Sequence, residues 1–281
     1  MRKILMGKTR VPEIVKRVAT ALVAAPVFLF LMWMGGWYFV LTLMLLTAVI
    51  QLEIMNMLDM EGMIIQKTMA LFLGVPVLLM AIIPETAWLF ILVLLLAVFL
   101  IETFSFSNSG WNRLMAVTVA GIMVPAFFSG LLMLRNYGDN ATGFILTFTL
   151  LLMVWANDIF AFFGGKSMGK HPLAPRISPS KTIEGFIWGV VGSFIALILC
   201  QLLIADYPLT WAVSIPFAVI AGLMGPAGDL AESKLKRASG IKDSSALMPG
   251  HGGMYDRFDA LLFSAPASIV YFRLLGFFSV L

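Results

Sequence analysis

Long runs of apolar residues dominate this chain and decide what it can fold into. Each run approaches the roughly 20 residues that a helix needs to cross the hydrocarbon core of a bilayer. A bilayer offers no water to unpaired backbone groups, so each run is expected to be a helix. The sequence therefore predicts an all-α, polytopic membrane protein. The expected spans are nine: 18–34, 37–58, 68–84, 87–103, 114–134, 142–163, 183–205, 209–228 and 258–279.

The composition excludes the other broad classes of protein. Hydrophobic residues make up 60% of the 281 positions and charged residues 12%, against about 45–50% and about 25% in soluble domains. A soluble fold has too little interior to hide this much apolar surface, and a disordered chain would be far more polar. The single cysteine, Cys200, excludes a disulfide scaffold and is expected to be a buried thiol.

The basic residues predict which side of the membrane each loop faces. If the N-terminus is cytoplasmic and nine helices alternate, seventeen of the nineteen Lys and Arg residues fall on the cytoplasmic side. Only Arg135 and Arg273 fall outside it. We therefore expect a cytoplasmic N-terminus and two regions. Residues 1–140 would hold about five transmembrane helices, and residues 141–281 would form a catalytic region with two polar cytoplasmic loops, 164–182 and 229–257.

These two loops and their flanks concentrate the polar chemistry of the chain. Asp158 lies within an apolar run, where an ionisable side chain is costly and usually faces a polar cavity. Asp229 and Glu232 share one helix face, as do Asp256 and Asp259. Carboxylate pairs that converge with substrate phosphates are the usual way in which Mg²⁺ is held. Interleaved basic residues and glycines strengthen the prediction of metal–phosphate chemistry, although a basic loop could instead only attract anionic headgroups.

Several familiar catalytic motifs are missing from the sequence. It contains no Walker-A motif, no His-x-x-x-His or Cys-His metal motif, and no Gly-x-Ser-x-Gly elbow. A P-loop ATPase, a zinc hydrolase and a serine hydrolase are therefore not expected. The basic residues do not gather on a soluble face, so nucleic acid is not an expected partner.

The polar segments resemble those of the phosphatidate cytidylyltransferases, also called CDP-diacylglycerol synthases. The resemblance is carried by residues 155–265, and its longest motif is Ser233-x-Leu-Lys236-Arg237-x₄-Lys242-Asp243-x-Ser245…Pro249-Gly-His251-Gly252-Gly253-Met-x-Asp256-Arg257-Phe-Asp259. Two upstream segments, Asp158-x-x-Ala161…Gly164 and Arg176-x-Ser178-Pro179-x-Lys181-Thr182-x-Glu184-Gly185, are similar to the same family.

The resemblance implies that CTP and phosphatidic acid react to give CDP-diacylglycerol and pyrophosphate, with Mg²⁺ as cofactor and room for a second cation. The implied catalytic residues are Asp158, Lys236, Arg237, Lys242, Asp243, His251 and Arg257. The implied substrate-binding residues are Arg176, Ser178, Lys181, Thr182, Ser233, Gly252 and Gly253. The implied metal ligands are Asp229, Asp256 and Asp259.

Other readings of the sequence stay open at this point. A CTP-dependent enzyme acting on a prenyl alcohol or an ether lipid would carry the same polar site. A transporter with Asp158 on an ion path is less favoured, because the predicted helices hold few ionisable groups. We expect an inner-membrane, multi-pass protein with its active side toward the cytoplasm. A homo-oligomer is compatible with the sequence.

Overall fold

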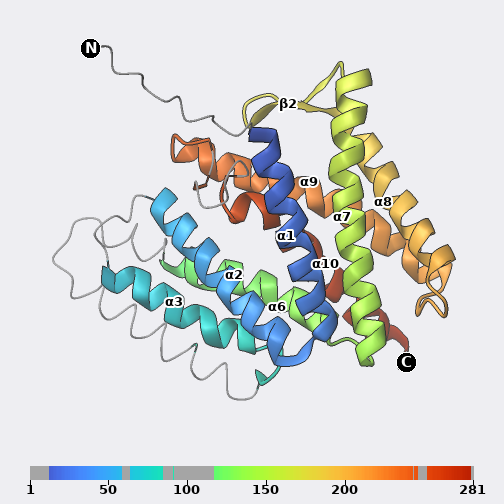
Figure 1. Ribbon diagram of the computed structural model, residues 1–281, viewed down its shortest axis with the longest axis horizontal. Coiled ribbons are helices and arrows are strands. Elements are labelled where there is room, and N and C mark those ends of the chain that lie inside the picture. The colour runs from blue at the N-terminus through green and yellow to red at the C-terminus, as the bar shows by residue number, and fades with distance from the viewer. Residues whose placement is uncertain are drawn as a thin grey trace, which may run out of the picture.

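The protein is a bundle of helices with one small hairpin at one end (Figure 1). The computed structural model describes residues 13–58, 64–84, 91, 117–242, 244–245 and 252–279. Its helices are α1 (Glu13–Met34), α2 (Gly36–Met57), α3 (Ile64–Leu79), the π-helical turn η1 (Val119–Met123), α6 (Val124–Arg135), α7 (Asn140–Met168), α8 (Ile183–Leu203), α9 (Trp211–Ala238) and α10 (Tyr255–Ser279). Strands β1 (Pro172–Ala174) and β2 (Ser178–Thr182) pair antiparallel between α7 and α8.

The helices of the described part coincide with predicted apolar runs, which confirms a mostly helical membrane protein. Among the described residues, α2, α7, α8, α9 and α10 contain stretches that are long and apolar enough to cross a bilayer. Apart from residue 91, the predicted run 87–103 lies outside the described residues, so the count of nine spans and the cytoplasmic N-terminus stay predictions. The hairpin departs from the expected all-α fold; its strands connect α7 to α8, and β2 contains the sequence Ser-Pro-Ser.

Two helices extend beyond the apolar runs into the polar segments. Helix α7 continues to Met168 and α9 continues to Ala238, so residues 164–168 and 229–238 are helical. The carboxylates at 229 and 232 therefore sit on a rigid helix and not on a loop. The proposed division near residue 140 stays a prediction.

Helices α7 and α8 pack closely because glycines line their contact. A Cβ atom on Gly192 would lie 2.7 Å from the Ala156 carbonyl oxygen, and one on Gly185 would lie 2.9 Å from the Ala161 carbonyl oxygen. Small residues permit such backbone approach between membrane helices. The buried amide of Asn157 adds hydrogen bonds of 3.2 Å to Ser193 Oγ on α8 and to the Gly222 carbonyl on α9. These contacts fix α7, α8 and α9 relative to one another.

A buried arginine joins the C-terminal ends of two helices, α6 and α1. Arg135, at the end of α6, is 2% exposed. Its guanidinium donates to the carbonyls of Met32 (2.7 Å) and Trp33 (3.1 Å) at the end of α1, and to Asn140 Oδ1 (2.7 Å). The last carbonyls of a helix have no intrahelical partner and carry partial negative charge. Arg135 therefore satisfies the end of α1 and ties it to the α6–α7 turn.

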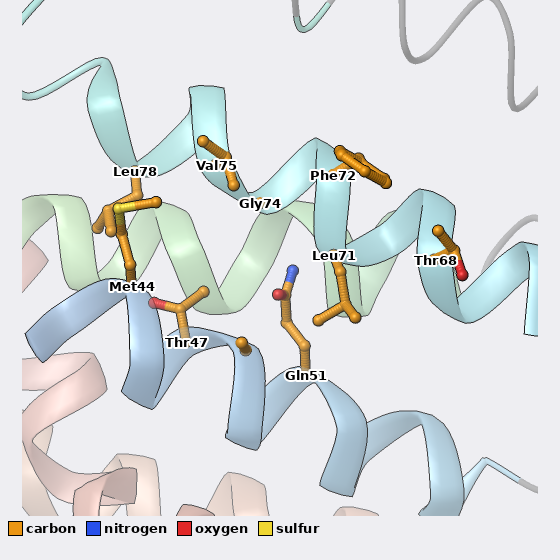
Figure 2. Close-up of a pocket in the computed structure, with 10 residues that line it drawn as sticks. Met44, Thr47, Gln51, Thr68, Leu71, Phe72, Gly74, Val75 and Leu78 are labelled. Carbon is orange, nitrogen blue, oxygen red and sulfur yellow. The ribbon is translucent and has the colours of Figure 1, made fainter. Parts of the chain in front are cut away.

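A cavity of about 310 Å³ lies between α2 and α3, mainly among apolar side chains (Figure 2). Gln51 extends from α2 toward Gly74 in that view. Its amide donates to the Ala70 carbonyl (3.0 Å) and to the Ala120 carbonyl (3.1 Å) in η1. Gly74 leaves the space for this amide, since a Cβ there would lie 2.5 Å from Gln51 Nε2. Gln51 thus links α2 to α3 and η1.

We predict that Arg135→Gln destabilises the protein by about 1–3 kcal/mol, because buried carbonyls lose a charged donor. The measurement is thermal unfolding of detergent-solubilised protein. Arg273→Gln is the matched control, because Arg273 is exposed on α10 and should leave the melting temperature unchanged. Equal melting temperatures for the two variants would contradict the role given to Arg135.

Candidate active site

Four elements from distant parts of the chain meet at one end of the bundle. They are the C-terminal end of α2, strand β2, the C-terminal part of α9 and the start of α10 together with the segment before it. We call this the polar end. It lies at the other end of α2 from the turn that Arg135 holds. Most of the residues singled out in the sequence gather here.

The polar end contains an acidic cluster of Asp229, Glu232 and Asp259. One carboxylate oxygen from each lies within 4.8 Å of the others. Glu232 is 2% exposed, and among the described residues its Oε1 has no hydrogen-bond partner. The cluster exists because α9 and α10 nearly touch: a Cβ on Gly228 would collide with the Asp259 carbonyl oxygen. Glycine at 228 therefore sets the separation of the two aspartates.

A lysine of the hairpin and polar side chains of α7 and α9 lie beside Asp229 of the acidic cluster. Lys181, on β2, forms an ion pair with Asp229 and holds the hairpin over α9. Asp158, on α7, is near enough to interact electrostatically with Asp229, Lys181 and Arg257. Ser233 Oγ donates to Asp229 Oδ1 at 3.4 Å. The structure thus brings residues from β2, α7, α9 and α10 into one charged site.

Lys236 connects the acidic cluster to the next carboxylate. Its Nζ lies 2.9 Å from Glu232 Oε2 and 2.5 Å from Asp256 Oδ1. The lysine is 9% exposed, and a buried ammonium is tolerable only between opposite charges. Removal of Lys236 would leave two carboxylates, Glu232 and Asp256, without their shared counter-charge.

Asp256 orders the segment that precedes α10. Its Oδ2 accepts hydrogen bonds from the backbone N–H of Gly253 (2.8 Å) and from the N–H (3.0 Å) and Oγ (2.9 Å) of Ser244. Oδ1 accepts the bond from Lys236 described above. The prediction from the sequence that Asp256 also binds a metal stays a prediction.

A carboxylate from the N-terminal half of the chain also reaches this segment. Glu53, near the end of α2, is 5% exposed. It accepts hydrogen bonds from Ser245 Oγ (2.6 Å), Ser244 Oγ (3.2 Å) and the backbone N–H groups of Met254 and Tyr255 (both 2.8 Å). The start of α10 is therefore held by a side chain on another helix.

Other predicted site residues lie at the edge of the polar end or form hydrogen bonds with backbone groups. Arg176, Arg237, Lys242 and Arg257 are exposed. The guanidinium of Arg237 donates to the Ile241 carbonyl (3.1 Å), and the Thr182 hydroxyl caps α8 by accepting from Gly185 N–H (3.1 Å).

The remaining predicted residues lie on the hairpin or in the segment before α10. Ser178 begins β2, and Gly252 has a φ of 80° that favours glycine. Asp243 and His251 lie outside the described residues. The roles predicted for these residues and for those at the edge of the polar end stay predictions.

Glu53 and Glu232 are absent from the sequence-based set of site residues. The signal for Glu232 was its place three residues after Asp229 on one helix face. The signal for Glu53 was weaker: an acidic residue inside an apolar run, far in the sequence from every motif. Its partners at 244–255 could not be inferred from spacing.

The donor set of the acidic cluster fits a hard divalent cation. All of its potential ligands are carboxylate oxygens, which Mg²⁺ and similar ions prefer. The unpartnered Glu232 Oε1 supplies an acceptor that a cation would satisfy. Phosphate oxygens and water would complete the coordination, since Mg²⁺ is usually bound through one or two carboxylates together with substrate phosphates. The chemistry that suits such a site is phosphoryl or nucleotidyl transfer.

Comparisons with known proteins agree with this chemistry. The sequence profile described as "Cytidylyltransferase family" matches residues 15–275. The chain is 34% identical to the phosphatidate cytidylyltransferase of Bacillus subtilis (strain 168), covering 94% of this chain and 98% of that protein. It is 32% identical to the enzyme of the same name from Staphylococcus haemolyticus and 33% identical to that from Staphylococcus aureus (strain COL), each over 89% of this chain and 95% of the relative.

We predict that Gly228→Ala weakens divalent-cation binding at least about tenfold, because the new methyl group forces α9 and α10 apart beside the acidic cluster. Binding of Mn²⁺ to purified protein, followed by electron paramagnetic resonance, is the measurement. Gly225→Ala is the matched control one turn earlier, since its Cβ would lie 3.7 Å from Ser264 Oγ in ordinary contact. Equal affinity of both variants would disprove the dependence on helix separation.

Proposed function

The chain belongs to the cytidylyltransferase family, and from that membership and the charged site at its polar end we propose that it transfers the cytidylyl group of CTP to phosphatidic acid. A phosphatidate oxygen attacks the α-phosphorus of CTP, a new P–O bond forms, and the bond to the β-phosphate breaks. The products are CDP-diacylglycerol and pyrophosphate. The observation that carries the proposal is the acidic cluster with Lys181 and Lys236 against it.

The acidic cluster is the proposed site of Mg²⁺. Asp229 and Asp259 would hold it from facing helices, with Glu232 beside them, and Asp256 could contribute through Oδ1. When bound, the cation supplies neutralisation of charge on the triphosphate and on the leaving pyrophosphate. A second cation is compatible with the number of acidic groups, since Asp158 lies close to Asp229.

The basic residues are proposed to bind and orient the two anionic substrates. Lys181 and Lys236 already lie against carboxylates, so both are placed to exchange a carboxylate for a phosphate oxygen. Arg176, Arg237, Lys242 and Arg257 are exposed at the edge of the site, where triphosphate or lipid phosphate can reach them. Catalysis then depends on alignment of the nucleophile and on electrostatic stabilisation.

The nucleophile needs no strong general base. The second pKa of a phosphate monoester is about 6, so the attacking oxygen is already ionised at neutral pH. The site residues therefore have to hold the attacking phosphate close to the α-phosphorus against its repulsion from the triphosphate. Lys181, on the hairpin above α9, is the residue that we assign to this task, with Arg176 and Ser178 on the same hairpin.

We also propose that the polar end faces the cytoplasm, where CTP is found. Seventeen Lys and Arg residues on one side of a nine-span topology support this orientation. The relatives named phosphatidate cytidylyltransferase are bacterial, which supports a location in the cell (inner) membrane. Residues 141–281 would then be the catalytic region, assisted by Glu53 of α2.

The first experiment is release of pyrophosphate by detergent-purified protein given CTP and Mg²⁺, with and without phosphatidic acid, and with EDTA as control. We expect release that requires both lipid and metal, with CDP-diacylglycerol formed in equal amount. Turnover only with a prenyl alcohol or an ether-lipid phosphate would keep the site and change the acceptor. No turnover with any lipid, in folded protein, would overturn the proposal and favour transport through Asp158.

We predict that Asp229→Asn and Asp259→Asn each lower kcat at least about 100-fold, because loss of a charged ligand weakens stabilisation of the transferring phosphates. Steady-state rates over a Mg²⁺ titration give the measurement. Asp139→Asn is the matched control: Asp139 caps α7 at the other end of the bundle, and asparagine is an equally good cap. Wild-type turnover in either cluster variant would exclude that residue as a ligand.

A further inference from the structure

Glu53 contributes to the polar end from α2, in the N-terminal half of the chain, and contacts residues about 200 positions further along. We propose that Glu53 is a positioning residue: it holds Ser244, Ser245 and the start of α10 in the shape that presents Asp256 and Arg257 to the nucleotide phosphates. The proposal rests on the proposed function for the identity of that ligand. The contacts themselves do not depend on it.

The first argument is the cap that Glu53 provides to α10. The first N–H groups of a helix have no intrahelical acceptor, and a negative charge is favoured there. In most helices a Ser, Thr, Asp or Asn just before the helix accepts from them. Here Met254 stands at that place, and Glu53 accepts from the N–H groups of Met254 and Tyr255 at 2.8 Å each. The start of α10 at Tyr255 is thus fixed from α2, four residues before Asp259.

The second argument is a continuous chain of polar contacts from Glu53 to the acidic cluster. Ser244 Oγ lies 3.2 Å from Glu53 Oε2 and 2.9 Å from Asp256 Oδ2. Asp256 Oδ1 in turn accepts from Lys236, and Lys236 pairs with Glu232. Displacement of the Glu53 carboxylate would therefore move Ser244 and Asp256, and with them the lysine beside the cluster.

The third argument is steric and concerns Gly253. A Cβ on Gly253 would lie 2.8 Å from both carboxylate oxygens of Glu53 and would collide with Ser244 Oγ. The segment before α10 therefore passes directly over the carboxylate, and only glycine leaves room for it. This contact with Glu53 gives a reason for glycine at position 253, in addition to the phosphate contact that the sequence predicts.

The test is Glu53→Gln, which keeps the shape of the side chain but replaces one acceptor oxygen with a donor. We expect KM for CTP to rise at least about tenfold with a smaller change in kcat, because the segment is misplaced before the nucleotide binds. Without substrates, hydrogen exchange of the peptide containing Met254 and Tyr255 should accelerate at least about tenfold.

The matched control is Gln51→Met on the same helix. The Gln51 amide donates to the carbonyls of Ala70 on α3 and Ala120 in η1, and neither of these partners belongs to α10 or to the residues that Glu53 contacts. We expect its KM and its exchange at Met254 and Tyr255 to equal those of wild type. Ser245→Ala is the second variant if Glu53→Gln does not fold. It removes the 2.6 Å hydrogen bond from Ser245 Oγ to Glu53 and should raise KM about threefold.

The outcomes separate the two proposals. Unchanged exchange and unchanged KM in Glu53→Gln would overturn the role of Glu53. Equal effects of Glu53→Gln and Gln51→Met would also overturn it, since they would report general packing of α2. If the wild-type protein shows no turnover with CTP and phosphatidic acid, the proposed function fails, and the exchange experiment alone decides whether Glu53 positions the segment.

Discussion

Mutual repulsion of carboxylates is the constraint around which the polar end is built. Asp229, Glu232 and Asp259 bring oxygens within 4.8 Å of one another at the end of membrane helices, where little water screens them. The protein compensates this repulsion from outside the cluster, with Lys181 on a hairpin and Lys236 one turn further along α9. Each lysine belongs to a different element, so the cluster and the arrangement of hairpin, α9 and α10 depend on one another. In the proposed reaction, such a site would exchange internal ion pairs for ion pairs with substrate phosphates at little electrostatic cost.

The two ends of the bundle are stabilised by opposite charges acting on opposite helix termini. Arg135 donates to free carbonyls at the end of α1, whereas Glu53 accepts from free N–H groups at the start of α10. Both are buried ionised side chains whose described partners include backbone groups left over by helix geometry. Helix ends in a membrane protein cannot rely on water throughout, and here a distant side chain takes the place of a local cap.

Much of this arrangement could be predicted from the sequence, and the limits have physical reasons. The apolar runs predicted the positions of the eight α-helices, and most helix ends lie within a few residues of the ends of the runs. The prediction succeeds because backbone groups in lipid must be satisfied internally, which leaves no alternative to helix. The apolar run ends at residue 228, whereas α9 continues to Ala238; the helical spacing of Asp229 and Glu232, and not hydropathy, indicated helix beyond the run. Helical spacing placed Asp229 and Glu232 together, and Asp256 with Asp259. Spacing within one helix says nothing about contacts between helices, so neither the Gly228 contact nor the reach of Glu53 to Ser244 was visible.

The distance along the chain between Glu53 and its partners has a consequence for biogenesis. Glu53 and Tyr255 are 202 positions apart, so α2 leaves the ribosome and enters the membrane long before α10 exists. During that interval the Glu53 side chain lacks the backbone N–H groups of Met254 and Tyr255 from which it finally accepts hydrogen bonds. The contacts between Glu53 and the start of α10 can therefore form only after α10 has been synthesised. A nascent chain interrupted before α10 would carry a Glu53 carboxylate without these two backbone donors.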